Sequence, residues 1–114
     1  MKLADIVDIV EGKVVCGQDM LGKKIDYAFS SDLLSDVLTI NKAGILLLTG
    51  VANMQTIRTA DVAEVSCVVL VRGKKASKEM IDLATDIGLV LVESEGSMFG
   101  TGGKLYQKGL QPLY

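Results

Sequence analysis

Short apolar runs alternate with amphipathic segments along most of this chain. Residues 45–49, 66–71 and 89–92 are nearly continuous apolar runs, rich in leucine and valine, and each has the length of one strand. Runs of this kind are typical of strands in a parallel sheet whose two faces are both covered by helices. The pattern therefore predicts three buried strands.

Helices are predicted between and after these strands. Residues 54–63 have helical spacing and follow Asn53, which can serve as the N-cap, and a second helix should end at Gly88. A last helix is expected over about residues 103–108. The glycine-rich residues 100–104 fit neither the Walker A nor the dinucleotide-binding pattern. We expect a flexible helix start or close helix packing there, with an anion contact as the alternative.

The N-terminal third of the chain is less regular. Apolar residues at helical spacing before Gly12 predict a first helix, and residues 13–16 and 25–29 are short β-rich segments on either side of a polar loop. A further helix should begin near Asp32, with Ser31 as its N-cap. The apolar stripe of that helix would consist of Leu33, Leu34, Val37 and Leu38.

The alternation of strands and helices predicts the α/β class. We expect a single domain over residues 1–114, with a mostly parallel sheet of about four or five strands flanked by helices. A chain of 114 residues with 49% hydrophobic content can bury one core without metal or disulfides. Cys16 and Cys67 lack CxxC spacing and are expected to be buried free thiols.

The predicted topology indicates where a ligand would bind, because ligands of open α/β sheets bind beyond the carboxyl ends of the strands. Arg72, Lys74, Lys75 and Lys78 cluster after one strand and at the start of a helix, where backbone N–H groups already favour an anion. They are the best phosphate candidates, and a solvated charged turn is the alternative interpretation. The full set of candidate ligand-binding residues is Ser30, Ser31, Asp32, Thr49, Asn53, Arg72, Lys74, Lys75 and Ser94.

No catalytic constellation is visible in the sequence. The chain has no histidine that could activate its serines, and we expect neither a metal site nor a cofactor. Asp32 and Asp36 would lie on one helix face, which leaves a carboxylate pair as a less favoured enzyme hypothesis. The aromatic residues Phe29, Phe99 and Tyr106 are expected to serve packing rather than recognition.

Charge and hydropathy narrow the choice of partners. The formal net charge is −2 and the pI is near 5.0, which argues against nucleic acid because phosphate neutralisation needs a basic face. The apolar runs are far shorter than the roughly 20 residues that cross a bilayer, and the N-terminus lacks a signal-peptide pattern. We expect a cytoplasmic protein that binds neither nucleic acid nor membrane.

Four segments carry a resemblance to a known family. They are YAFSSDLLSDVL, ILLLTG, VVLVRGKKASKEMIDLATDIGLVLVES and a tail that ends in LYQKGL. Together they resemble the DRTGG domain across nearly the whole chain. That domain is similar to the N-terminal domain of bacterial HPr kinase/phosphorylase, and it occurs between the CBS domains of some family II pyrophosphatases, in some phosphotransacetylases and as a free-standing protein. The Thr-Gly-Gly of the family's name is missing here, since Asp26, Tyr27 and Ala28 stand nearest to its place, so ligand contacts of that loop are not carried over.

The resemblance implies a function. In the pyrophosphatases it implies a non-catalytic, dimerising module that works beside nucleotide-binding CBS domains. For this chain we expect a regulatory or sensor domain, a homodimer that binds a nucleotide or phosphorylated small molecule at the strand-end loops. One alternative is a protein-interaction module that docks on a metabolic enzyme without a small ligand. A small enzyme is the less favoured alternative.

Overall fold

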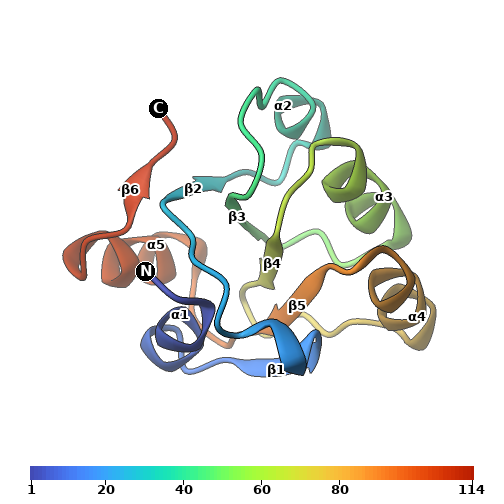
Figure 1. Cartoon of the computed structure of the whole chain (residues 1–114), viewed down its shortest axis with the longest axis horizontal. Coiled ribbons are helices and arrows are strands. Elements are labelled where there is room, and N and C mark those ends of the chain that lie inside the picture. The colour runs from blue at the N-terminus through green and yellow to red at the C-terminus, as the bar shows by residue number, and fades with distance from the viewer.

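The computed structural model describes all residues 1–114, which form helices around one central sheet (Figure 1). None of the helices combines the length and the apolar composition that crossing a membrane requires. The helices are α1 (Leu3–Ile9), α2 (Leu34–Val37), α3 (Met54–Val62), α4 (Lys78–Ile87) and α5 (Met98–Gln107), with a short 3₁₀ helix, η1, at Gln18–Met20. The strands are β1 (Lys13–Cys16), β2 (Tyr27–Ser30), β3 (Leu46–Thr49), β4 (Cys67–Leu70), β5 (Val90–Glu93) and β6 (Gln111–Pro112).

The six strands form one sheet in the order β1-β5-β4-β3-β2-β6. All neighbouring strands are parallel except β1 and β5, which run antiparallel. The predicted α/β class and mostly parallel sheet are thereby confirmed. The sheet has one strand more than expected because Gln111 and Pro112 pair with β2. A two-residue strand leaves no periodic signal in a sequence, and its proline is tolerated because β6 lies at the sheet edge.

The central strands β3, β4 and β5 are buried along their whole length. Alternate residues of a strand point to opposite faces, so Leu48 and Val69 pack in the core under α1 and α5, whereas Leu47 and Val68 pack in the core under α3 and α4. Figure 1 shows α1 and α5 on one side of the sheet and α2, α3 and α4 on the other. Two apolar layers therefore enclose the sheet. The polar side chains of the central strands lie at the strand ends.

Two predicted helix ends are confirmed. Asn53 caps α3, because its Oδ1 accepts a hydrogen bond from the Thr56 N–H at 3.1 Å. Gly88 ends α4 with a φ of 73°, a left-handed conformation that glycine adopts without steric cost.

The structure corrects the predicted start of α2. The helix begins at Leu34 instead of near Asp32. Ser31 does not cap it, since the Ser31 hydroxyl accepts a hydrogen bond from the Leu33 N–H at 3.0 Å in a local turn before the helix. Serine can bond to backbone groups two residues ahead as readily as it caps a helix, and the sequence does not separate the two arrangements.

The late start of α2 changes two further expectations. Asp32 precedes the helix and does not share a helix face with Asp36, so the carboxylate-pair hypothesis loses its geometric basis. The expected apolar stripe is incomplete as well: Val37 is fully buried, but Leu33 and Leu38 are more than half exposed. A helix of one turn has too few residues to bury a stripe.

The predicted start of α5 is also wrong. The helix begins at Met98, and Ser97 caps it by accepting a hydrogen bond from the Gly100 N–H at 3.0 Å. The glycine-rich residues 100–104 therefore lie inside the helix and do not form a flexible start. Their low helix propensity obscures the helix in the sequence.

The true start of α5 sets which of its side chains face solvent. Thr101 and Leu105 are buried against the sheet. Phe99 and Tyr106 consequently point away from the core and are 92% and 63% exposed. The expectation that these two aromatic residues serve packing is not met within a single chain, because both side chains are exposed.

Both cysteines are free and buried, as expected. Complete burial raises the pKa of the Cys67 thiol far above its ordinary value. Cys16 donates a hydrogen bond from its thiol to the Leu89 carbonyl, with a separation of 3.3 Å. Neither sulfur is exposed to solvent.

We therefore expect the native protein to react slowly with the thiol reagent DTNB at neutral pH, because the exposed thiolate is the reactive species. After unfolding in guanidinium chloride, both thiols should react within the mixing time of the same assay. Rapid release of even one equivalent from the folded protein would contradict the burial described here.

Candidate functional site

Four parallel strands end along one edge of the sheet. Asp32 follows β2, Thr49 ends β3, Arg72 follows β4 and Glu93 ends β5. These residues are far apart in the sequence, but the parallel arrangement brings them together at the edge where ligands of open α/β sheets bind.

At the centre of this edge, three donors converge on the carboxylate of Asp32. Its Oδ1 accepts hydrogen bonds from the Gly50 N–H at 2.7 Å and from the Thr49 hydroxyl at 3.2 Å. The Arg72 guanidinium donates to Oδ2 at 3.1 Å and forms an ion pair. Donors from the ends of β3 and β4 thus meet an anion supplied by the end of β2. We call Asp32, Thr49, Gly50 and Arg72 the strand-end cluster.

The absence of a side chain at Gly50 is needed for this geometry. A Cβ atom at that position would overlap the guanidinium of Arg72. Any larger residue would displace Arg72 from its contact with Asp32. The sequence offered no reason to single out Gly50, because the approach of Arg72 comes from a different strand.

The backbone also fixes Arg72. Arg72 and Gly73 have φ values of 60° and 71°, so two successive residues are left-handed. For a residue with a side chain this conformation costs roughly 1–2 kcal/mol. The Arg72 N–H donates to the Gly96 carbonyl at 2.7 Å and the Gly73 N–H to the Ser94 carbonyl at 3.0 Å. These bonds hold the loop after β4 against the loop after β5 and stabilise the turn.

The cluster controls the charge of its carboxylate. The Gly50 N–H lowers the pKa of Asp32, partial loss of hydration opposes this effect, and Arg72 and Thr49 lower the pKa further. Asp32 is therefore ionised at neutral pH and keeps its charge to a lower pH than an ordinary aspartate does.

A second group of charges lies on the neighbouring loop. Lys75 Nζ is 3.2 Å from a carboxylate oxygen of Glu95 and 3.8 Å from one of Glu93. Glu93 is buried and accepts a hydrogen bond from the Ala76 N–H at 2.8 Å. Lys75 is thus balanced by two carboxylates. Lys74 is exposed and takes part in no ion pair.

The other predicted site residues use their polar atoms elsewhere. Asn53 caps α3. Ser94 is buried, and its hydroxyl donates to the Val10 carbonyl at 2.7 Å. Ser31 forms the local turn described above, and Ser30 faces a hollow on the α5 side of the sheet. Of the nine predicted residues, the structure brings together Asp32, Thr49 and Arg72, since the side chains of Thr49 and Arg72 both contact Asp32.

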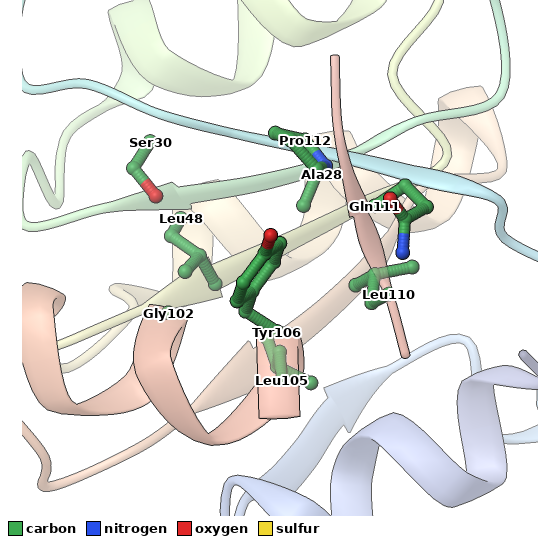
Figure 2. Close-up of a pocket in the computed structure, with 9 residues that line it drawn as sticks. All are labelled: Ala28, Ser30, Leu48, Gly102, Leu105, Tyr106, Leu110, Gln111 and Pro112. Atoms are coloured by element: carbon green, nitrogen blue, oxygen red, sulfur yellow. The ribbon is translucent and has the colours of Figure 1, made fainter. Parts of the chain in front are cut away.

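Figure 2 shows the hollow that Ser30 lines, between β2, β6 and α5, with Tyr106 beside it. Its volume is about 110 Å³, which is smaller than the roughly 300 Å³ at the lower end of small-molecule pockets. The hollow is too small to enclose a nucleotide. The lining residues are Ala28, Ser30, Leu48, Gly102, Leu105, Tyr106, Leu110, Gln111 and Pro112.

The sequence did not identify Glu93 and Glu95 as the carboxylates that balance Lys75 in the loop after β4. Glu93 ends the strand beside β4, so adjacency of these two parallel strands predicts a contact with the loop that contains Lys75. This contact follows from the order of the strands in the sheet, and the sequence does not reveal that order.

Comparisons with known proteins bear on the fold. No protein-family model matches this chain, and no curated protein matches it. Among solved structures, the chain is similar to the CBS and DRTGG domains of the regulatory region of a Clostridium perfringens pyrophosphatase, in complex with its activator diadenosine tetraphosphate. The TM-score is 0.73 at 16% sequence identity. The fold is DRTGG-like. The match covers 96% of this chain and 47% of the other, so the chain spans about half the length of that regulatory region.

The lowered pKa of Asp32 predicts how the stability of the protein depends on pH. Ionised Asp32 stabilises the folded state at pH values above the usual carboxyl pKa of about 3.9, and this contribution is lost as the pH falls through the lowered pKa of the folded state. Asp32→Asn should therefore destabilise the protein at pH 7, by about 1 kcal/mol or less because the ion pair is partly exposed. The difference from the wild type should shrink steadily below about pH 4.

Chemical denaturation across pH 2–7 measures this difference. Asp61→Asn is the matched control, because Asp61 is an exposed aspartate on α3 that forms no ion pair. A difference between Asp32→Asn and the wild type that stays constant over the whole pH range would contradict the described environment of Asp32.

Proposed function

We propose that this chain is a non-catalytic regulatory domain that binds a nucleotide or another phosphorylated small molecule at the strand-end cluster and acts as a homodimer in the cytoplasm. The observation that carries the proposal is the convergence of three donors on the Asp32 carboxylate. These donors already bind an anion, which is the carboxylate of the chain's own Asp32.

A phosphate group uses the same donors as a carboxylate. Backbone N–H groups, hydroxyls and the planar guanidinium of arginine all bind phosphate oxygens. The Asp32 and Arg72 side chains are 42% and 44% exposed, so a ligand phosphate can approach from solvent and take the place of the carboxylate. Lys74, two residues after Arg72, adds a positive charge that no carboxylate of the chain balances.

Regulation fits this edge better than catalysis. The polar groups of the cluster are paired with one another. The Thr49 hydroxyl donates to the Asp32 carboxylate, but it is buried and also accepts a hydrogen bond from the Val51 N–H, so it is not presented to a substrate as a nucleophile. The similar pyrophosphatase region is regulatory and binds a nucleotide activator, which supports the same class of role here.

A second candidate function is docking on a metabolic enzyme without a small ligand. Several large apolar side chains are exposed, and exposed apolar surface can mark a protein-interaction site. These residues are Leu33, Leu38, Val62, Phe99, Tyr106 and Tyr114.

Thermal unfolding with adenine and guanine nucleotides, diadenosine polyphosphates and phosphorylated metabolites tests the proposal. A ligand at 100 times its Kd should stabilise the folded state by about 2.7 kcal/mol. Arg72→Ala should weaken binding by about 10-fold or more, since a hydrogen bond to a charged group contributes roughly 1.5–3 kcal/mol. Asp32→Asn should strengthen binding, because it removes the competing charge and keeps an oxygen that can accept from Gly50.

Arg58→Ala is the control for Arg72→Ala, because Arg58 is an exposed arginine on α3 that forms no ion pair. It should bind the ligand as the wild type does. If Asp32→Asn and Arg72→Ala weaken binding equally, displacement of Asp32 is not the mechanism. If no phosphorylated compound raises the melting temperature, the docking function becomes the better explanation.

A further inference from the structure

One face of α5 exposes two aromatic side chains with only glycine between them. Phe99 is 92% exposed and Tyr106 is 63% exposed. An open hollow of about 530 Å³ lies along this face and is lined by Ser30, Met98, Phe99, Gly102, Gly103 and Tyr106. We call Phe99, Gly102, Gly103 and Tyr106 the aromatic face of α5.

Helix geometry places these four residues on the same side of α5. Residues seven positions apart are about 20° apart around the axis and about 10.5 Å apart along it, at 3.6 residues per turn and 1.5 Å per residue. Phe99 and Tyr106 therefore form two aligned projections. Gly102 and Gly103 lie between them and leave the helix backbone open to contact.

The aromatic face is symmetric about its own centre. Gly102 and Gly103 flank the midpoint of the face, and Phe99 and Tyr106 lie at equal distances from that midpoint in opposite directions along the helix. A two-fold axis that runs through the midpoint pairs α5 antiparallel with α5 of a second copy. Phe99 of one copy then lies beside Tyr106 of the other, and the glycines of both copies meet at the crossing point. A surface that complements itself under two-fold rotation is what a symmetric dimer requires.

We propose that the aromatic face of α5 is the surface through which two copies of this chain associate. This inference rests on the homodimer of the proposed function and names its interface. Glycine at the crossing point lets two helix backbones approach closely. Each Phe99 fills the open hollow beside the glycines of the other copy, and offset or edge-to-face contact with Tyr106 adds to the apolar burial.

Electrostatics favour the same arrangement. The aromatic face carries no charged residue, so two copies meet without burying an unpaired charge. The antiparallel pairing also brings the positive end of one helix dipole near the negative end of the other.

The size of the face sets the expected strength of the dimer. Aromatic side chains bury 150–250 Å² each when covered, so the exposed parts of Phe99 and Tyr106 offer roughly 300 Å² per copy. A standard interface buries about 800 Å² per partner. The adjoining surface of β2 and β6 must add to the aromatic face, and we expect a dimer that dissociates at micromolar concentrations.

Sedimentation velocity of the full chain from low to high micromolar concentration tests this interface. The wild type should sediment as a dimer at the upper end of the range and as a monomer at the lower end. Phe99→Ser should shift the dimer dissociation constant upward by tenfold or more. Val62→Ser is the matched control, because Val62 is 72% exposed but lies on α3, and it should sediment as the wild type does.

The variant Gly103→Ala distinguishes an effect on the dimer interface from an effect on the stability of the monomer. A Cβ at Gly103 meets no other atom of the chain, and alanine is a better helix former than glycine, so the monomer should melt at a higher temperature. The same methyl groups would keep two helices apart and weaken the dimer. A dimer that survives both Phe99→Ser and Gly103→Ala would overturn the inference but leave the homodimer standing. A wild-type chain that stays monomeric at every concentration would overturn both.

Ligand binding is measured separately in these variants. Phe99 and Gly103 lie outside the strand-end cluster, so phosphate ligands should raise the melting temperatures of the variants as they raise that of the wild type. A dimer that depends on the aromatic face, in a protein that binds no phosphorylated compound, would support this interface and contradict the ligand-sensing part of the proposed function.

Discussion

The complete burial of β3, β4 and β5 between two apolar layers is the constraint on which the rest of the structure depends. No side chain of these strands reaches solvent before the strands end, so polar chemistry is confined to the positions where the chain leaves the sheet. Since the strands are parallel, these positions lie at one edge, and polar or charged groups from four distant segments meet there. The strand-end cluster is therefore a consequence of the sheet topology.

Arg72 and Lys75, two of the cationic side chains at this edge, are paired with carboxylates and do not form a region of excess positive charge. A buried carboxylate such as Glu93 requires donors, because an unpaired charge in the interior is costly, and the Ala76 N–H together with Lys75 provides them. Arg72 is held in the same way by Asp32. A cluster of cations in the sequence is consequently a poor measure of free positive charge. A ligand phosphate must compete with carboxylates that already pair with these cations. Its affinity is therefore the difference in free energy between the new ion pair with the ligand and the existing ion pair within the chain.

The sequence predicts those elements whose limits depend on local signals. It does not predict features that depend on contacts between residues far apart in the chain. Asn53 and Gly88 mark helix ends by their own chemistry, and the continuous apolar runs identify the central strands. The limits of α5 could not be predicted, because three glycines hide a helix that is stabilised by the burial of Thr101 and Leu105. The contact of Arg72 with Gly50 was equally hidden, since it depends on strand order and on a left-handed backbone that few non-glycine residues adopt.

The glycines of α5 also bear on why two chains would associate. Each glycine inside a helix costs about 1 kcal/mol relative to alanine, and α5 contains three. Within one chain the space around Gly103 is open, and a Cβ at Gly102 would make ordinary contacts with Leu48 and Ser30 at 3.7 and 4.0 Å. A Cβ at Gly100 would lie only 3.1 Å from the Oγ of the capping Ser97, so packing within the monomer accounts for that glycine but not for Gly102 and Gly103. A helix that crosses another helix at this point does explain them, and the exposure of Phe99 on the same face leads to the same conclusion from an independent observation.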